Sequence, residues 1–152
     1  MAEELTGAIR DNLKTALKER DAFRASVLRM ALAAVSNKEI QLLKKGVGLS
    51  DEEVREVIRA EVKKRKDAAA EFSKGGREDL VVKETKEAEL LSAYLPPEIS
   101  DEEIARIVKE GIREAGATSK ADFGKVMKTV MPVLKGKASG DRISAILAGL
   151  LE

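Results

Sequence analysis

The sequence predicts an all-α protein, and two observations lead to this prediction. Apolar residues recur three and four positions apart along almost the whole chain, which is the period of helices that bury one face. The pair Val81-Val82 is too short for a strand, and the longer apolar patterns all have the helical period. The Pro96-Pro97 pair ends a helix and divides the chain. We therefore expect an N-terminal bundle of about four helices in residues 1–97 and a small C-terminal three-helix domain in residues 98–152.

The first two helices are predicted from apolar stripes. The first stripe consists of Leu5, Ile9, Leu13, Ala16 and Leu17. Asp21 can cap a second helix, because its carboxylate accepts hydrogen bonds from free backbone N–H groups. The apolar face expected for that helix consists of Phe23, Val27, Leu28, Met30, Leu32, Ala34 and Val35. Gly46 and Gly48 interrupt the pattern, and the nearby apolar residues Leu42-Leu43 and Val47 fit either a core or an interface.

A capping box marks the start of the third helix, since Ser50 is followed three residues later by Glu53. Its expected core residues are Val54, Val57, Ile58, Val62, Ala69 and Phe72. Gly75-Gly76 ends this helix, and a fourth is expected from about Arg77 to Leu95. Residues 63–66 form the densest basic run, and we interpret it as a solvated face because consecutive positions point in different directions around a helix.

Three shorter helices are expected after the proline pair. A second capping box, Ser100 with Glu103, starts the fifth helix, which ends near Gly116. Its expected core residues are Ile104, Ile107, Val108 and Ile112. Ser119 can cap the sixth helix, and Pro132 should kink that helix or bring its end forward. The residues expected to point inward are Phe123, Val126, Met127, Val130 and Leu134. Ser139 or Asp141 caps the last helix, which buries Ile143, Ile146, Leu147 and Leu150.

Composition excludes several classes of enzyme. The chain has no His and no Cys, so Ser-His and Cys-His pairs are excluded, although a Ser-Lys dyad is left open. The acidic clusters at 51–53 and 101–103 lie at helix starts, where acids are favoured, and their side chains diverge rather than surround an ion. Gly136-Lys137 lacks the following Ser or Thr and the preceding Gly of a phosphate-binding loop. We therefore predict no catalytic residue, no metal and no cofactor.

Charge and hydropathy favour a cytoplasmic protein. The chain has 28 basic and 27 acidic residues, a balance that does not by itself indicate nucleic-acid binding. It lacks the run of about 20 apolar residues that a membrane-spanning helix needs. Its first residues include acids where a signal peptide has Lys or Arg. The lack of cysteine suits a reducing compartment. We expect no contact with a membrane.

The C-terminal part departs from this charge balance. Residues 98–115 contain six acids and three bases, whereas residues 116–152 contain six bases and three acids. The connection Lys135-Gly136-Lys137-Ala138-Ser139-Gly140 joins lysines to glycines, which let a partner approach the backbone closely. It also precedes a helix start, where anions are favoured. From the residues alone, a phosphate-binding surface and an ordinary solvated surface fit this pattern equally well.

The chain resembles the YqeY-like proteins over its full length. The residue runs that carry this resemblance are 26–30 (SVLRM), 33–35 (AAV), 37–40 (NKEI), 76–80 (GREDL), 89–91 (ELL) and 94–96 (YLP). The most specific positions are Gly124-Lys125-Val126-Met127, Met131, Lys135-Gly136-Lys137-Ala138 and Gly140. Helix packing does not require glycines and lysines at these offsets, which gives the match its weight. Lys128, Ser139 and Ser144 depart from the family pattern, which usually has Gly, an acidic or amide residue, and Asn at these positions.

The resemblance implies a function as well as a fold. YqeY-like proteins are similar to the C-terminal helical region of the B subunit of tRNA-dependent amidotransferases, in which the small domain contacts tRNA. The residues implied to contact RNA phosphates are Lys125, Lys128, Lys135, Lys137 and Arg142, with Gly124, Gly136 and Gly140 permitting close approach. The carbon–nitrogen ligase activity, with glutamine as amide donor, belongs to other parts of that enzyme, so we expect a non-catalytic tRNA-associated protein.

Two other functions are compatible with the sequence. The same glycine-lysine surface could dock on a protein partner such as a synthetase, an amidotransferase or a ribosomal protein, which would make the chain an adaptor. A ligase that acts alone is the weakest hypothesis, because it needs a nucleotide site and a nucleophile that the sequence does not show.

Overall fold

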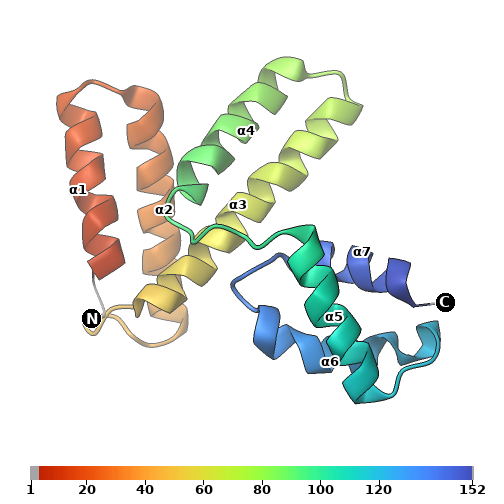
Figure 1. The fold of residues 1–152 in the computed structure, drawn as a ribbon. Helices are drawn as coiled ribbons and strands as arrows, with labels where there is room; N and C mark the ends of the chain where they lie inside the picture. The colour runs from red at the N-terminus through yellow and green to blue at the C-terminus, as the bar shows by residue number, and fades with distance from the viewer. Residues whose placement is uncertain (1–3, 152) are drawn as a thin grey trace. The chain divides into compact units, whose positions relative to one another are not determined.

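The computed structural model describes residues 4–151, and every regular element among them is a helix (Figure 1). This confirms the all-α class. The elements are α1 (Glu4–Lys18), α2 (Ala22–Gln41), α3 (Asp51–Lys74), α4 (Glu78–Ser92), α5 (Asp101–Ala115), the 3-10 turn η1 (Lys120–Asp122), α6 (Phe123–Leu134) and α7 (Gly140–Leu150). The chain forms two compact units, Met1–Leu95 and Pro96–Glu152, whereas the sequence places the boundary after Pro97.

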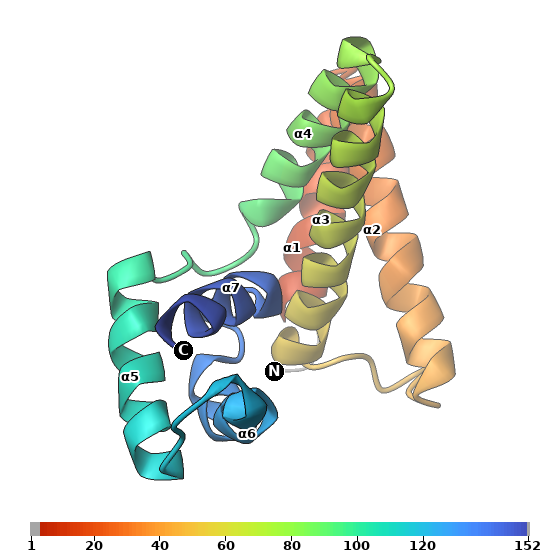
Figure 2. The ribbon, with the colours of Figure 1, turned by 90° about the vertical axis from the view of Figure 1, so that its right-hand side faces the viewer.

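The N-terminal unit consists of two helical hairpins, α1–α2 and α3–α4 (Figures 1 and 2). Their apolar faces meet in one core of aliphatic side chains. This core contains Ile9, Val27, Leu28, Ala31, Val35, Leu49, Val54, Val57, Ile58, Val62, Ala88 and Leu91. Each fully buried Leu, Ile or Val contributes about 1.5–3 kcal/mol by leaving water, so burial on this scale holds the two hairpins together.

The start of α3 is fixed by the predicted cap. The Ser50 hydroxyl oxygen accepts a hydrogen bond from the Glu53 N–H at 3.2 Å. The adjacent acid serves a second helix, because the N–H of Leu5 in the first turn of α1 donates to Oδ1 of Asp51 at 2.9 Å. One of the acids at this helix start therefore joins α1 to α3, which supports a structural role for the 51–53 cluster.

Some sequence predictions about burial in this unit are wrong. Phe23 and Met30 are 40% and 43% exposed, because the apolar stripe of α2 is wider than the part that packs in the core. Arg65 is only 5% exposed, so the basic run at 63–66 is not a uniformly solvated face. Leu43 and Val47 are 92% and 71% exposed, which removes the core alternative for these two residues.

The C-terminal unit packs α5, α6 and α7 around a core of its own. The buried residues of this core are Ile104, Val108, Val126, Val130, Leu134, Ile143, Leu147 and Leu151. Phe123 and Met127 pack against it and are partly buried, as the helical period predicts. Among the described residues, no helix is both long enough and apolar enough to span a membrane.

Two glycines and a proline shape this unit. Gly111 on α5 is buried, and an added Cβ there would collide with Cγ1 of Val130 on α6, so glycine permits the close approach of the two helices. Gly116 ends α5 in the left-handed conformation, with φ 64°, which is typical of helix C-caps. Pro132 lies within α6, which continues to Leu134 although proline cannot donate the usual backbone hydrogen bond.

Candidate nucleic-acid interface

Two of the predicted site lysines lie on the solvent side of α6. The buried residues Val126, Val130 and Leu134 define the inner side of this helix. Lys125 and Lys128 are three residues apart, a spacing that places side chains next to each other on a helix surface, and both are exposed. Neither lysine forms an ion pair with another described residue. The fold therefore presents both ammonium groups to solvent on the same side of α6.

The connection between α6 and α7 carries the next two lysines. The Lys135 N–H donates to the Met131 carbonyl at 2.8 Å, and the Lys137 N–H donates to the Leu134 carbonyl at 2.9 Å. The Lys137 carbonyl in turn accepts a hydrogen bond from the Ile99 N–H at 3.0 Å, which attaches the connection to the segment before α5. The side chains of Lys135 and Lys137 are exposed, so the backbone is held while the charged groups reach solvent.

The three glycines predicted at the site have different reasons to be glycine. Gly136 has φ 81°, a left-handed conformation that other residues adopt at a cost of roughly 1–2 kcal/mol. An added Cβ at Gly124 or Gly140 would meet no heavy atom within 4 Å. Packing therefore does not require glycine at these two positions, and both leave the exposed backbone open to a partner.

Arg142 lies in a different environment from the lysines. Its guanidinium pairs with the carboxylates of Glu98 and Asp101, and its Nη2 donates to the Ile99 carbonyl at 3.0 Å. The hydrogen bonds to Asp101 and then to Glu98 raise the pKa of Arg142, so its charge is permanent. In the C-terminal unit this residue joins α7 to the segment before α5.

Asp122, the residue before α6, lies close enough to Lys125 for their charges to interact. Oδ2 of Asp122 accepts a hydrogen bond from the Thr118 N–H at 2.9 Å. That bond, opposed by desolvation and assisted by the Ser119 backbone and the charge of Lys125, holds the pKa of Asp122 below its ordinary value of 3.8. Asp122 is thus ionised at neutral pH and offsets part of the positive charge of Lys125.

This surface offers groups that can bind anions. The sequence contains no His or Cys, and the described residues contain no group of three or more acids placed to hold a metal ion. What the surface offers is ammonium groups and exposed backbone at glycine, which suit an anionic partner with several charges.

Comparison with known proteins shows which family the chain belongs to. The sequence profile of one family, described as Yqey-like protein, matches residues 6–151. The chain belongs to the YqeY-like family. Similar curated proteins include the fungal "Altered inheritance of mitochondria protein 41, mitochondrial" of Kluyveromyces lactis, which is 35% identical over 147 residues, covering 90% of this chain and 77% of the relative. The protein of the same name from Clavispora lusitaniae is 29% identical, covering 83% of this chain and 74% of its own length.

A third relative extends further beyond the matched region. The protein of that name from Saccharomyces cerevisiae (strain YJM789) is 31% identical over 135 residues, which cover 89% of this chain and 63% of the relative. All three names include the word mitochondrial. The compartment expected for this YqeY-like chain from its sequence, the cytoplasm, stays a prediction.

Sequence reasoning missed one role in this YqeY-like chain. It grouped Arg142 with the lysines as a phosphate contact, whereas the structure places Arg142 against Glu98 and Asp101, more than forty residues earlier. A local pattern does not reveal such a pairing. The negative charge of residues 98–115 was visible in the sequence, and it was the only sign that a nearby cation could be engaged within the unit.

Proposed function

We propose that this protein binds tRNA through the phosphate backbone, using the exposed lysines of its C-terminal unit, and that it carries out no reaction itself. The observation that carries the proposal is the pair Lys125 and Lys128, exposed on the same side of α6 without an ion pair to any described residue. Membership of the YqeY-like family supports it through the resemblance of that family to the tail of the amidotransferase B subunit.

Each residue of the surface has a distinct part in the proposal. Lys125 and Lys128 contact phosphates from α6, and Lys135 and Lys137 contact them from the connection to α7. Such contacts position the RNA without selecting a base sequence. Arg142 acts indirectly, because its guanidinium holds the segment to which the Lys137 carbonyl is bonded. Gly124 and Gly140 allow the RNA backbone to approach.

Charge reversal on α6 tests this assignment. Lys125→Glu with Lys128→Glu should weaken binding to every tRNA species and reduce the salt dependence, because each phosphate contact contributes a log–log slope of roughly −0.7 to −0.9. The matched control is Lys14→Glu with Lys18→Glu on α1, which changes the net charge equally at two exposed positions of the other unit. Equal loss in both variants would show that only overall charge matters and would contradict the site.

A second function, docking on a partner protein, is favoured by one observation. Val133 on α6 is 49% exposed, and an exposed aliphatic side chain suits a protein interface better than a phosphate backbone. The two functions differ in salt response, since an interface built mainly on apolar contacts depends far less on ionic strength. Recovery of a defined partner protein after nuclease treatment, with no binding of pure tRNA, would favour the adaptor.

The glutamine-dependent carbon–nitrogen ligase activity of the amidotransferase is not part of the function proposed for this protein. Measurable glutamine-dependent ATP turnover by the pure chain would overturn our assignment of a non-catalytic role. The proposal requires only a compartment that contains tRNA. The cytoplasm predicted from the sequence and the mitochondrion named in the relatives both meet this requirement.

A further inference from the structure

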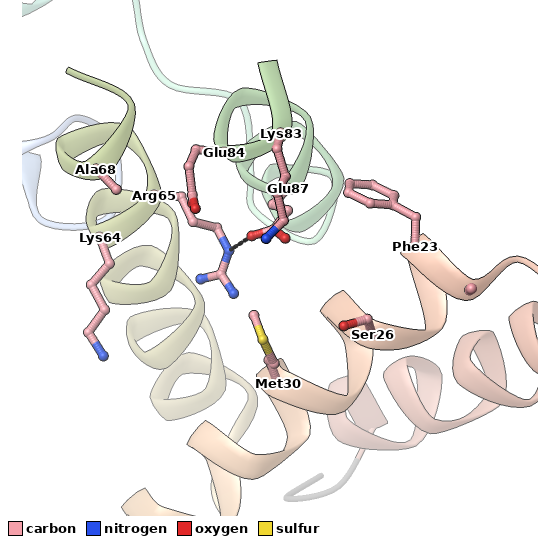
Figure 3. A pocket seen from close by; sticks show the side chains of 10 residues that line it. Phe23, Ser26, Met30, Lys64, Arg65, Ala68, Lys83, Glu84 and Glu87 are labelled. Atoms are coloured by element: carbon pink, nitrogen blue, oxygen red, sulfur yellow. Dashed lines mark hydrogen bonds and ion pairs between the residues drawn. The ribbon is translucent and has the colours of Figure 1, made fainter. Parts of the chain in front are cut away.

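The N-terminal unit contains a cavity that the proposed function does not use. It lies between α2 on one side and α3 and α4 on the other, and its volume is about 540 Å³ (Figure 3). Its apolar wall comes from the exposed side of α2, where Phe23 and Met30 stand apart from the core of the unit. Ser26 lies between these two residues along α2 and adds a hydroxyl group.

A buried arginine stands on the opposite wall. Arg65 is 5% exposed, and its Nε donates to Oε2 of Glu87 at 3.1 Å. Its Nη1 donates to the carbonyl oxygen and to Oε2 of Glu61, at 3.0 and 2.8 Å. Its Nη2 makes no hydrogen bond to any described residue, and the guanidinium points into the cavity towards Met30 (Figure 3). Nη2 is not closed off from solvent, so it is a donor that faces the cavity and can be taken over from water by an acceptor that enters.

The charges around the cavity indicate which acceptor fits. The charged residues that line the cavity are Lys64, Arg65, Lys83, Glu84 and Glu87. Glu61 does not line it but pairs with Arg65 and adds a third carboxylate. The formal charges of these six groups cancel. Desolvation raises the pKa of Glu61, but hydrogen bonds from Arg65 and Lys64 outweigh it and hold this pKa below its ordinary value, so Glu61 stays ionised. An anion that entered would meet carboxylates as well as cations, whereas a neutral oxygen would accept from Nη2 without adding charge.

The apolar wall indicates what accompanies that oxygen. Met30 is unbranched and polarisable and adapts to irregular partners, and Phe23 offers a broad apolar face. A main-chain carbonyl next to an aliphatic side chain combines both features. Carbonyls of this kind are left unpaired in extended segments and in the last turn of a helix.

We propose that this cavity binds a peptide segment of a partner protein, with an aliphatic side chain between Phe23 and Met30 and a main-chain carbonyl accepting from Nη2 of Arg65. The site is separate from the lysines of the C-terminal unit. Its test is therefore independent of tRNA binding, and either proposal can fail without the other.

The test uses the full chain with ¹³C-methyl methionine and the blocked amino acid N-acetyl-leucine-N′-methylamide as the probe. A ligand of this size should bind in the millimolar range, so the titration extends to about 100 mM. The Met30 methyl signal should shift and saturate, while those of Met127 and Met131 in the other unit stay unchanged. Ser26→Lys should weaken binding at least about fivefold by filling the cavity, whereas Ser36→Lys, an exposed position on the same helix outside the cavity, should not.

Two outcomes would overturn the proposal. One is a Met30 signal that does not move, or that moves equally in the Ser26→Lys variant. The other is binding of N-acetyl-leucine, with its free carboxylate, about tenfold more tightly than the blocked compound, because this would identify an anionic small molecule rather than a peptide carbonyl as the occupant.

Discussion

Replacing Gly111 by alanine should destabilise the C-terminal unit, although alanine is the better helix former. The added Cβ would collide with Cγ1 of Val130, a residue that is 1% exposed. Valine has one strongly preferred χ1 rotamer in a helix, so Cγ1 of Val130 can move aside only if the side chain leaves that rotamer or α6 shifts as a whole. The matched control is Gly149→Ala on α7, where an added Cβ meets no heavy atom within 4 Å.

The expected magnitude follows from two opposing effects. Alanine gains about 0.8–1 kcal/mol over glycine from helix propensity. Overpacking a well-packed core costs typically about 1–3 kcal/mol. For Gly111→Ala the net result should be a loss of about 1 kcal/mol, whereas Gly149→Ala should gain up to about 1 kcal/mol. The two substitutions are chemically identical and should have opposite signs.

The assay is urea unfolding of the full chain followed by ¹³C-methyl methionine signals. Met127 and Met131 pack against the C-terminal core and report on that unit, while Met30 reports on the other. With an m-value of about 1 kcal/mol per molar urea, the midpoint of the C-terminal unit should fall by about 1 M in Gly111→Ala. The midpoint that Met30 reports should not change.

A double-mutant cycle decides whether the collision is the cause. In the background Val130→Ala, the change Gly111→Ala should become neutral or stabilising, because the colliding methyl group is gone. The coupling free energy should then be about 1–3 kcal/mol, typical of residues in contact. Additive effects, or stabilisation by Gly111→Ala alone, would refute the close packing of α5 on α6.

Three further substitutions test the interactions of Arg142, Glu53 and Arg65, each by its own measurement. Arg142→Gln should speed hydrogen exchange of the Ile99 N–H about fivefold, because the contacts that hold that segment are lost; unchanged protection would contradict the role assigned to the guanidinium. Glu53→Gln should flatten the fall in stability at low pH, measured by urea unfolding from about pH 3 to pH 7. The hydrogen bond from Lys44, opposed by desolvation, keeps the pKa of Glu53 below 4.5, so its stabilisation is complete above the unfolded-state pKa and is lost as pH falls through the lower folded-state value. Arg65→Leu should cost the N-terminal unit about 3–5 kcal/mol by leaving the buried carboxylate of Glu87 unpaired, and a loss under about 1 kcal/mol would contradict a structural ion pair.

The helices were predictable because the features that define them are local. Ser50 and Ser100 each accept a hydrogen bond from the N–H three residues later, and that chemistry is visible in four consecutive letters. The inward side of α6 followed from its three/four spacing, and so did the exposure of Lys125 and Lys128. The period of a helix and the rules of capping are enough to predict these features.

The sequence predictions that were wrong concern residues whose surroundings depend on contacts between distant positions. Arg65 is buried because Glu87 lies 22 residues later on the helix that packs against α3. Arg142 pairs with Glu98, which lies 44 residues earlier in the chain. Phe23 is exposed because the neighbouring hairpin covers only part of the apolar stripe of α2. No local pattern states which residue will meet which, so these pairings became visible only in the folded chain.

The measurement that tests the central claim most directly is the binding of the full chain to total tRNA across a salt series, followed by fluorescence anisotropy. The account predicts binding whose affinity falls steeply with salt, with a slope that becomes shallower by about 1.5 when Lys125 and Lys128 are both reversed, since two phosphate contacts are lost. No binding at low salt, or a slope that the reversal leaves unchanged, would contradict the claim that these lysines bind an RNA backbone.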